Sequence, residues 1–252
     1  MSHETGPLLS ERHGDVLLLT MNRPERHNAF NATLNHLLGD AVRRADTEGA
    51  KVIVLTGAGD KAFCAGGDML EMSGVEDASE LPPPGERTTG TTELERTPLP
   101  VIAAINGFCY GGGARLAISC DIRLASETAT FRLPGAEYGL VVAAASLPRL
   151  VGAARAKDWI FTARTVDARE AREAGLVTSL HRPEDLLPAA LAMAEVIAGR
   201  DQSAVRESKR VIDAATLDDD ARELEDSANK RLRGTEEQKR RFREATRNVT
   251  GR

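Results

Sequence analysis

Aromatic residues are scarce in this 252-residue chain. One Trp, two Tyr and six Phe make up only 4% of it, whereas 41% of all residues are hydrophobic. A core built from this composition must therefore consist mainly of Ala, Val, Leu and Ile. The length suits a single α/β domain with an appended helical region, and the hydrophobic content is sufficient for a substantial core.

Cysteine is also rare, with only Cys64, Cys109 and Cys120 in the chain. An odd count without metal-type spacing favours reduced thiols in a cytoplasmic protein, and no bound metal is expected. Cys64 and Cys109 lie in glycine-rich segments, where one of them could act as a nucleophile. No histidine lies in those segments to activate a thiol, so small core residues are the favoured interpretation.

An excess of basic residues is absent too. The formal net charge is −5, which argues against general nucleic-acid binding, because that function usually shows a basic patch. No run approaches the roughly 20 apolar residues of a membrane helix. Residues 1–12 lack the charged-then-apolar pattern of a secretion signal. These absences predict a soluble cytoplasmic protein that contacts neither nucleic acid nor membrane.

Apolar runs alternate with helical patterns in the first two thirds of the chain. Strands are expected at residues 15–21, 51–56, 100–105 and 121–126, with helices after residue 31 and over residues 111–119. This alternation predicts crossover units with parallel strand pairing, and hence an α/β fold.

Helix-forming composition dominates from residue 153 onward. Helices are expected at 153–162, 167–174, 184–199, 202–215 and 219–245. We place a boundary between a core of residues 1–195 and a C-terminal helical region of residues 196–252. In the last helix, Ala221, Leu224, Ala228 and Leu232 form an apolar stripe, which either covers the chain's own core or packs against another subunit.

Two glycine clusters each follow a strand-like run. They are residues 62–68 (Ala-Phe-Cys-Ala-Gly-Gly-Asp) and residues 106–113 (Asn-Gly-Phe-Cys-Tyr-Gly-Gly-Gly). Glycine allows backbone to approach a ligand closely, and two N–H groups from separate segments can converge on one oxygen. Such a pair stabilises negative charge that develops on a thioester or ester carbonyl, as an oxyanion hole does. The alternative is that these glycines only make tight turns.

These segments resemble the crotonase family, the enoyl-CoA hydratase/isomerase superfamily, and the resemblance extends over most of the chain. Its further parts are residues 22–30 (Asn-Arg-Pro-Glu-Arg-His-Asn-Ala-Phe), 52–57, 100–107, 120–126, 147–152 and 171–177. The resemblance implies a crotonase (ClpP-like) spiral of β-β-α units with a C-terminal helical trimerisation region. It also implies a homotrimer or a dimer of trimers.

Site residues follow from the same resemblance. Gly67 and Gly112 would donate the two oxyanion N–H groups. Coenzyme A, as part of an acyl-CoA or enoyl-CoA substrate and with no further cofactor, would contact the residues Arg26, His27, Ala65, Gly66, Gly67, Asp68 and Phe242. Asp68 is better explained as the cap of the following helix. Phe242, together with Lys239, resembles residues that reach the coenzyme across a trimer interface.

The sequence departs from the family at two catalytic positions. Hydratases of the family use two glutamates, and the corresponding positions here hold Arg115 and Gly135. Neither residue can accept a proton at ordinary pH. Glu137 is the nearest remaining carboxylate. On a strand it would share the face of Gly135, so it could serve as a displaced base or simply be a solvated surface residue.

Arg115 itself has two interpretations. It could pair with a carboxylate or carbonyl of the substrate, or form an ion pair with a nearby acid such as Glu137. The loop that follows residue 140 is about three residues shorter than in relatives. Some relatives place a catalytic Asp in this loop, where Ala143 is the nearest residue here.

Three functions compete. The first is a CoA-thioester enzyme of the hydratase/isomerase type with non-standard proton transfer, and the second is a non-catalytic acyl-CoA-binding protein. A dinucleotide-binding enzyme is the third, because Gly57-Ala58-Gly59 follows a strand. The segment at 63–67 breaks the helix which that motif must open, so the third function is disfavoured.

Overall fold

The computed structural model describes residues 6–73, 81–83 and 86–250. Residues 74–90, which include Pro82-Pro83-Pro84-Gly85, are predicted from their sequence to form a loop, and this loop falls partly outside that range. Near its C-terminal end Thr88 packs on helix α1 (Ala32–Ala45): the Thr88 hydroxyl donates to the His36 carbonyl at 3.0 Å, and Thr88 itself is buried. This contact fixes the start of the next helix.

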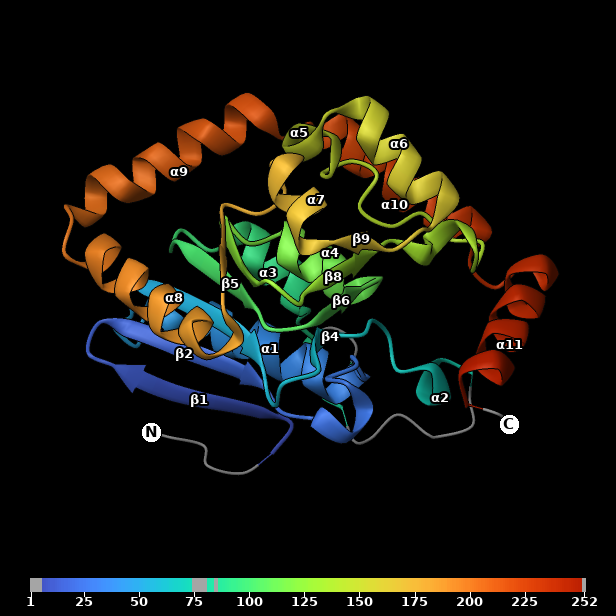
Figure 1. Ribbon diagram of the computed structural model, residues 1–252, viewed down its shortest axis with the longest axis horizontal. Coiled ribbons are helices and arrows are strands. Elements are labelled where there is room, and N and C mark those ends of the chain that lie inside the picture. The colour runs from blue at the N-terminus through green and yellow to red at the C-terminus, as the bar shows by residue number, and fades with distance from the viewer. Residues whose placement is uncertain (1–5, 74–80, 84–85, 251–252) are drawn as a thin grey trace.

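Two sheets form the framework (Figure 1). The larger sheet has the order β1-β2-β3-β5-β7-β10, and the smaller one has the order β4-β6-β8-β9. The strands are β1 Leu8–His13, β2 Val16–Met21, β3 Val52–Gly57, β4 Ala62–Cys64, β5 Val101–Ile105, β6 Phe108–Tyr110, β7 Ile122–Ser126, β8 Thr130–Arg132, β9 Val166–Asp167 and β10 Ser179–His181. Pairing is parallel except for β1 with β2 and β8 with β9.

Successive strand pairs divide between the two sheets. Strands β3, β5 and β7 lie side by side in the large sheet, while the strands that follow each of them, β4, β6 and β8, lie side by side in the small one. Each repeat therefore adds one strand to each sheet before a helix returns the chain. This confirms the predicted α/β class and the spiral of β-β-α units.

The central strand β3 is buried on both faces, as its continuous apolar sequence predicted. Ile53 and Leu55 belong to the main core between the sheets. Val52 and Val54 face the other way and pack with Ala190 and Ala194 of α8, in the core cluster that this helix shares with the large sheet. Strand alternation thus fills two separate layers from a single segment.

The helices largely confirm the predicted boundaries. They are α1 Ala32–Ala45, α2 Met69–Met72, α3 Gly90–Arg96, α4 Gly112–Ile118, α5 Pro148–Val151, α6 Ala153–Thr162, α7 Ala168–Glu173, α8 Pro183–Ala198, α9 Gln202–Thr216, α10 Asp219–Leu232 and α11 Glu236–Thr250. The single helix predicted over 219–245 is wrong. It is broken at Gly234, whose φ of +82° ends a right-handed helix. Helix α8 continues past residue 195 to Ala198, so the domain boundary drawn there falls within its last turn.

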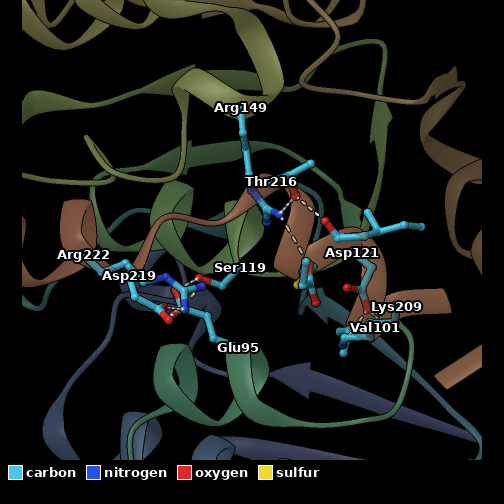
Figure 2. Close-up of polar contacts among 12 residues, drawn as sticks. Glu95, Val101, Ser119, Asp121, Arg149, Lys209, Thr216, Asp219 and Arg222 are labelled. Carbon is cyan, nitrogen blue, oxygen red and sulfur yellow. Dashed lines mark hydrogen bonds and ion pairs between the residues drawn. The ribbon is translucent and has the colours of Figure 1, made fainter. Parts of the chain in front are cut away.

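Ion pairs attach the C-terminal helices to the core (Figure 2). Lys209 of α9 lies 2.9 Å from Asp121, whose carboxylate also accepts the Val101 N–H at 2.7 Å. Arg222 of α10 lies 3.9 Å from Glu95, and Glu95 accepts the Ser119 hydroxyl at 2.9 Å. The cations and carboxylates of this cluster satisfy one another, so we assign it a structural role.

Apolar side chains remain exposed on these helices. Val211 and Ile212 of α9 are 57% and 60% exposed, and a cavity of about 610 Å³ lies between α9 and the sheet edge. Leu224 of the predicted apolar stripe is 70% exposed, so the stripe does not cover the chain's own core there. None of the helices in the described residues is both long and apolar enough to cross a membrane.

Candidate active site

Asn28 shapes the loop that leads into the site. Its side chain is fully buried and donates to the carbonyls of Ala58 and Ala62, while its Oδ1 accepts the Arg23 N–H at 2.9 Å. These bonds hold Asn28 at a φ of +54°. Arg23 then reaches across to Asp68, at 2.9 Å. The loop and the first glycine cluster are thereby fixed to each other.

A short parallel bridge sets the direction of the Gly67 N–H. The Phe30 N–H donates to the Gly66 carbonyl at 2.7 Å, and the Asp68 N–H donates to the Phe30 carbonyl at 2.6 Å. Because Phe30 uses the groups on either side of Gly67, the N–H of Gly67 itself points away from this strand. Asp68 caps α2 by accepting the Leu70 N–H, as predicted.

The backbones of the two glycine clusters lie against each other. A Cβ added to Gly66 would lie 3.1 Å from the Tyr110 carbonyl oxygen and 3.5 Å from the Gly112 nitrogen. One added to Gly112 would lie 3.7 Å from the Gly67 nitrogen. Gly66 has a φ of +107° and Gly111 one of +51°, conformations that glycine adopts without steric cost. The backbone of Gly67 therefore lies close to that of Gly112, at the start of the helix that follows.

Helix α4 begins directly at this meeting point. A Cβ on Gly113 would lie 2.1 Å from the Cys64 carbonyl oxygen, so only glycine permits the helix to pack this closely on β4. Met72 lies on the other side, because its sulfur is 2.3 Å from the position that a Cβ of Gly67 would take. The site is therefore bounded by α4, β4 and α2.

Arg115 lies one turn along α4 from Gly112 and is paired with a residue that the sequence did not suggest. Its Nη1 is 3.4 Å from the carboxylate of Glu225 on α10. The predicted ion pair with a nearby acid is therefore confirmed, but Glu137 is not its partner. Glu137 binds Arg132 at 2.5 Å and is 42% exposed.

Glu225 is only 6% exposed and holds the loop after residue 140. Its two oxygens accept the N–H groups of Ala143 at 3.0 Å and Ala145 at 2.8 Å. One helical turn further on, Asn229 exchanges two hydrogen bonds with the backbone of Val141. Ala143 is buried and has a φ of +57°, which costs a non-glycine residue roughly 1–2 kcal/mol, so these contacts stabilise a strained loop.

Gly135 lies in a short 3-10 helix, Pro134–Ala136, and not on a strand. The prediction that Glu137 shares its face is therefore wrong, because strand alternation does not apply there and three residues make one turn of this helix. A Cβ at Gly135 would lie 2.8 Å from the Leu140 carbonyl oxygen and 2.9 Å from a methyl group of Val142. The segment after residue 139 occupies the space that a side chain at 135 would need.

The residues expected to contact a coenzyme fall into two groups. Arg26 and His27 lie beside the first glycine cluster, since the Ala65 N–H donates to the His27 carbonyl at 3.0 Å. Phe242 lies in a second group, buried against Tyr138 of the same chain at a centroid distance of 6.1 Å. It lines a cavity of about 480 Å³ together with Met72 and Leu140. Whether either group binds coenzyme stays a prediction.

All three thiols are buried, and among the described residues the hydrogen bonds of the Cys64 and Cys120 thiols go to backbone carbonyls and not to a base. Desolvation by burial raises the pKa of Cys64 and of Cys120 to about 12, and the pKa of Cys109 well above its ordinary value. A protonated thiol is a poor nucleophile, so these residues fit the predicted packing role. Within the described ranges, no three His, Cys, Asp or Glu side chains gather as a metal site.

Comparison with known proteins identifies the family and agrees with the fold. Residues 11–248 match the sequence profile of the family described as enoyl-CoA hydratase/isomerase. A crotonyl-CoA hydratase of Syntrophomonas wolfei is 36% identical over 208 residues, covering 80% of this chain and 79% of that protein.

Two solved structures share the whole architecture. An enoyl-CoA hydratase/isomerase from Pseudoalteromonas atlantica T6c superposes with a TM-score of 0.86 at 29% identity, covering 98% of each chain. A carnitinyl-CoA dehydratase from Mycobacterium avium 104 gives 0.83 at 32% identity, covering 93% of this chain and 95% of that one. Fold and glycine clusters together define a crotonase-type protein. The chain belongs to the enoyl-CoA hydratase/isomerase family.

Proposed function

We propose that this protein binds a coenzyme A thioester and stabilises the enolate of its acyl group with the N–H groups of Gly67 and Gly112. One observation supports the proposal: the two glycines come from separate segments, yet a Cβ added to Gly112 would lie only 3.7 Å from the Gly67 nitrogen. Two such donors favour charge that develops during reaction, which is the chemistry of a lyase or isomerase of this family.

Proton transfer is proposed to differ from that of ordinary hydratases. Arg115 and Gly135 occupy the positions where the family resemblance places glutamates, and Glu137 is engaged with Arg132. Both oxygens of Glu225 already accept backbone N–H groups. A positioned acid–base group contributes about 10²–10⁴ in rate, so we expect hydration of simple enoyl-CoAs to be slow.

The second candidate is a non-catalytic acyl-CoA-binding protein. The packing at Gly135 favours it, since Leu140 and Val142 fill the space of a side chain that would move a proton. The two N–H groups do not separate the candidates, because they would also bind the carbonyl of an unreacted thioester.

Assembly is a further part of the proposal. Exposed Val211, Ile212 and Leu224 on α9 and α10 are consistent with packing against other subunits in a homotrimer or a dimer of trimers.

Arg26 and His27 are proposed to contact the coenzyme phosphates, for which a guanidinium is well suited.

The two candidates are separated by incubating the protein with a panel of enoyl-CoAs in D₂O and recording mass spectra. Deuterium incorporation without added water would support enolate formation. Added water would mean that hydration occurs despite Arg115 and Gly135, and would contradict the proposed loss of hydratase chemistry. Thioesters that bind but do not change would favour the non-catalytic candidate.

A further inference from the structure

Arg115 has hydrogen-bonding capacity that the protein does not use. A guanidinium carries five N–H donors. Among the described residues, the only acceptor within reach of this one is Glu225, at 3.4 Å from Nη1, and the Arg115 side chain is 35% exposed. The remaining donors therefore have no acceptor among these residues, and the side chain is partly accessible to solvent.

The charge of Glu225 is stabilised by two backbone N–H groups as well as by Arg115. Its oxygens accept the Ala143 and Ala145 N–H groups at 3.0 and 2.8 Å, both shorter than its contact with Arg115. Ala143, which donates the first of these N–H groups, has the left-handed conformation. Successive N–H groups in a turn of this kind form a concave site that binds anions. Glu225 thus fixes the position of Arg115 without fully compensating its charge.

Arg115 also has a defined position relative to the oxyanion site. It follows Gly112 by three residues on α4, so both lie on one face of the helix, about 5 Å apart along its axis. A carbonyl oxygen bound at the Gly112 N–H would bring the first acyl carbons of a thioester within reach of the guanidinium.

The adjoining cavity has the same sign of charge. It is the 480 Å³ cavity beyond Met72, which covers Gly67, and Leu140, which lies over Gly135. Arg233, Lys239 and Arg243 line it, and no Asp or Glu is found among the described residues of its lining. The field in this cavity favours an anionic ligand group.

We infer that the natural acyl group carries a second, anionic end, and that Arg115 binds it: the substrate class is the CoA monothioester of a dicarboxylic acid. This inference rests on the proposed function, because it assumes a thioester held at Gly67 and Gly112. A planar guanidinium can pair with a carboxylate through two N–H groups, which Lys cannot do.

The test compares succinyl-CoA with butyryl-CoA, whose four-carbon acyl chains differ only in a carboxylate that replaces a methyl group. Equilibrium binding is measured by titration calorimetry on the full chain. We expect succinyl-CoA to bind about 10-fold or more tightly than butyryl-CoA to the wild-type protein. In Arg115→Met the preference should fall below about 3-fold, with butyryl-CoA affinity unchanged, and Arg115→Lys should be intermediate.

A matched control replaces the cavity cations, as the double variant Arg233→Met/Arg243→Met. It should retain most of the preference, since these side chains contribute field and not the paired contact. Equal wild-type affinities for the two thioesters would overturn the inference, as would a preference that survives in Arg115→Met or Arg115→Lys unchanged. If free CoA and both thioesters fail to bind, the proposed function itself fails, a result distinct from loss of the preference alone.

Discussion

At the scale of single residues, Gly112 offers the sharpest test of the oxyanion proposal. It has room for one methyl group, because a Cβ there would meet Phe30 at 3.4 Å and other atoms at ordinary contact distances. That methyl group would lie 3.7 Å from the Gly67 nitrogen, where we propose that the oxyanion binds. Substitution by Ala can therefore remove the binding position of the oxygen without disturbing the fold.

We expect Gly112→Ala to lower turnover of any thioester that the wild-type converts by about 10²–10³-fold, an effect comparable to the loss of one oxyanion donor, because the methyl group would displace the oxygen from the retained N–H groups. Gly112→Pro, which removes the N–H itself, should abolish turnover. Steady-state rates measure both effects. The matched control is Gly199→Ala at the end of α8, whose added Cβ also makes only ordinary contacts. More than a tenth of wild-type activity in Gly112→Ala would contradict the oxyanion assignment.

Residue identity alone could indicate the glycines but not Glu225. The glycine clusters follow strands, and the need for close backbone approach is visible in their sequence. Glu225 follows Leu224 but lies outside the predicted apolar stripe, so the helical pattern predicts a buried Leu224 and a solvated Glu225. The structure shows the reverse, because Leu224 is 70% exposed and Glu225 only 6%. The reason is the Ala143–Ala145 loop, whose free N–H groups attract a carboxylate from 82 residues away. No local pattern encodes that distance.

At the scale of secondary structure, the loop of residues 141–146 and helix α10 form one unit. Glu225→Ala would leave one buried N–H group, one partly buried N–H group and Arg115 without their partner. We expect a loss of about 3 kcal/mol in the free energy of unfolding, measured by urea denaturation. Glu223→Ala, an exposed glutamate on the same helix, should change it by no more than about 0.5 kcal/mol. Similar values for the two variants would show that Glu225 does not hold the loop.

Elements with strong periodicity were predictable, and those set by a single backbone conformation were not. Helix α6 begins and ends where its composition indicates, at Ala153 and Thr162. The sequence pattern predicts a single helix for α10 and α11 because charge and apolar spacing continue across Gly234, whereas the backbone becomes extended at Arg233 and takes a φ of +82° at Gly234. Helix α3 was missed, since its first residues, Gly90 and two threonines, have weak helix propensity and depend on contacts with α1.

At the scale of the whole molecule, the buried thiols predict sensitivity to alkali. Burial raises their pKa above the unfolded value, so folded thiols stay protonated while unfolded ones ionise. The stability due to the neutral thiols is therefore complete below about pH 9 and is lost as the pH rises towards 12. Each thiol should add about 1.4 kcal/mol per pH unit to the decline.

Urea denaturation at pH 8 and pH 10 measures this decline, and Cys120→Ala should make it shallower.

A thiol reagent should detect no fast-reacting cysteine in the native protein at pH 8 and three after denaturation. A native protein whose thiols react rapidly at that pH would show that burial does not protect them.

Glu225 binds both Arg115 and the loop of residues 141–146, and its helix α10 is synthesised much later than either of them. Ala143 and its carboxylate partner are separated by 82 residues, which a ribosome adds in roughly 4–16 s at about 5–20 residues per second. During that interval, the two backbone N–H groups of the loop have no Glu225 to bind. The glycine half of the site can form as its strands emerge, whereas the half that contains Arg115 has to await the C-terminal end of the chain.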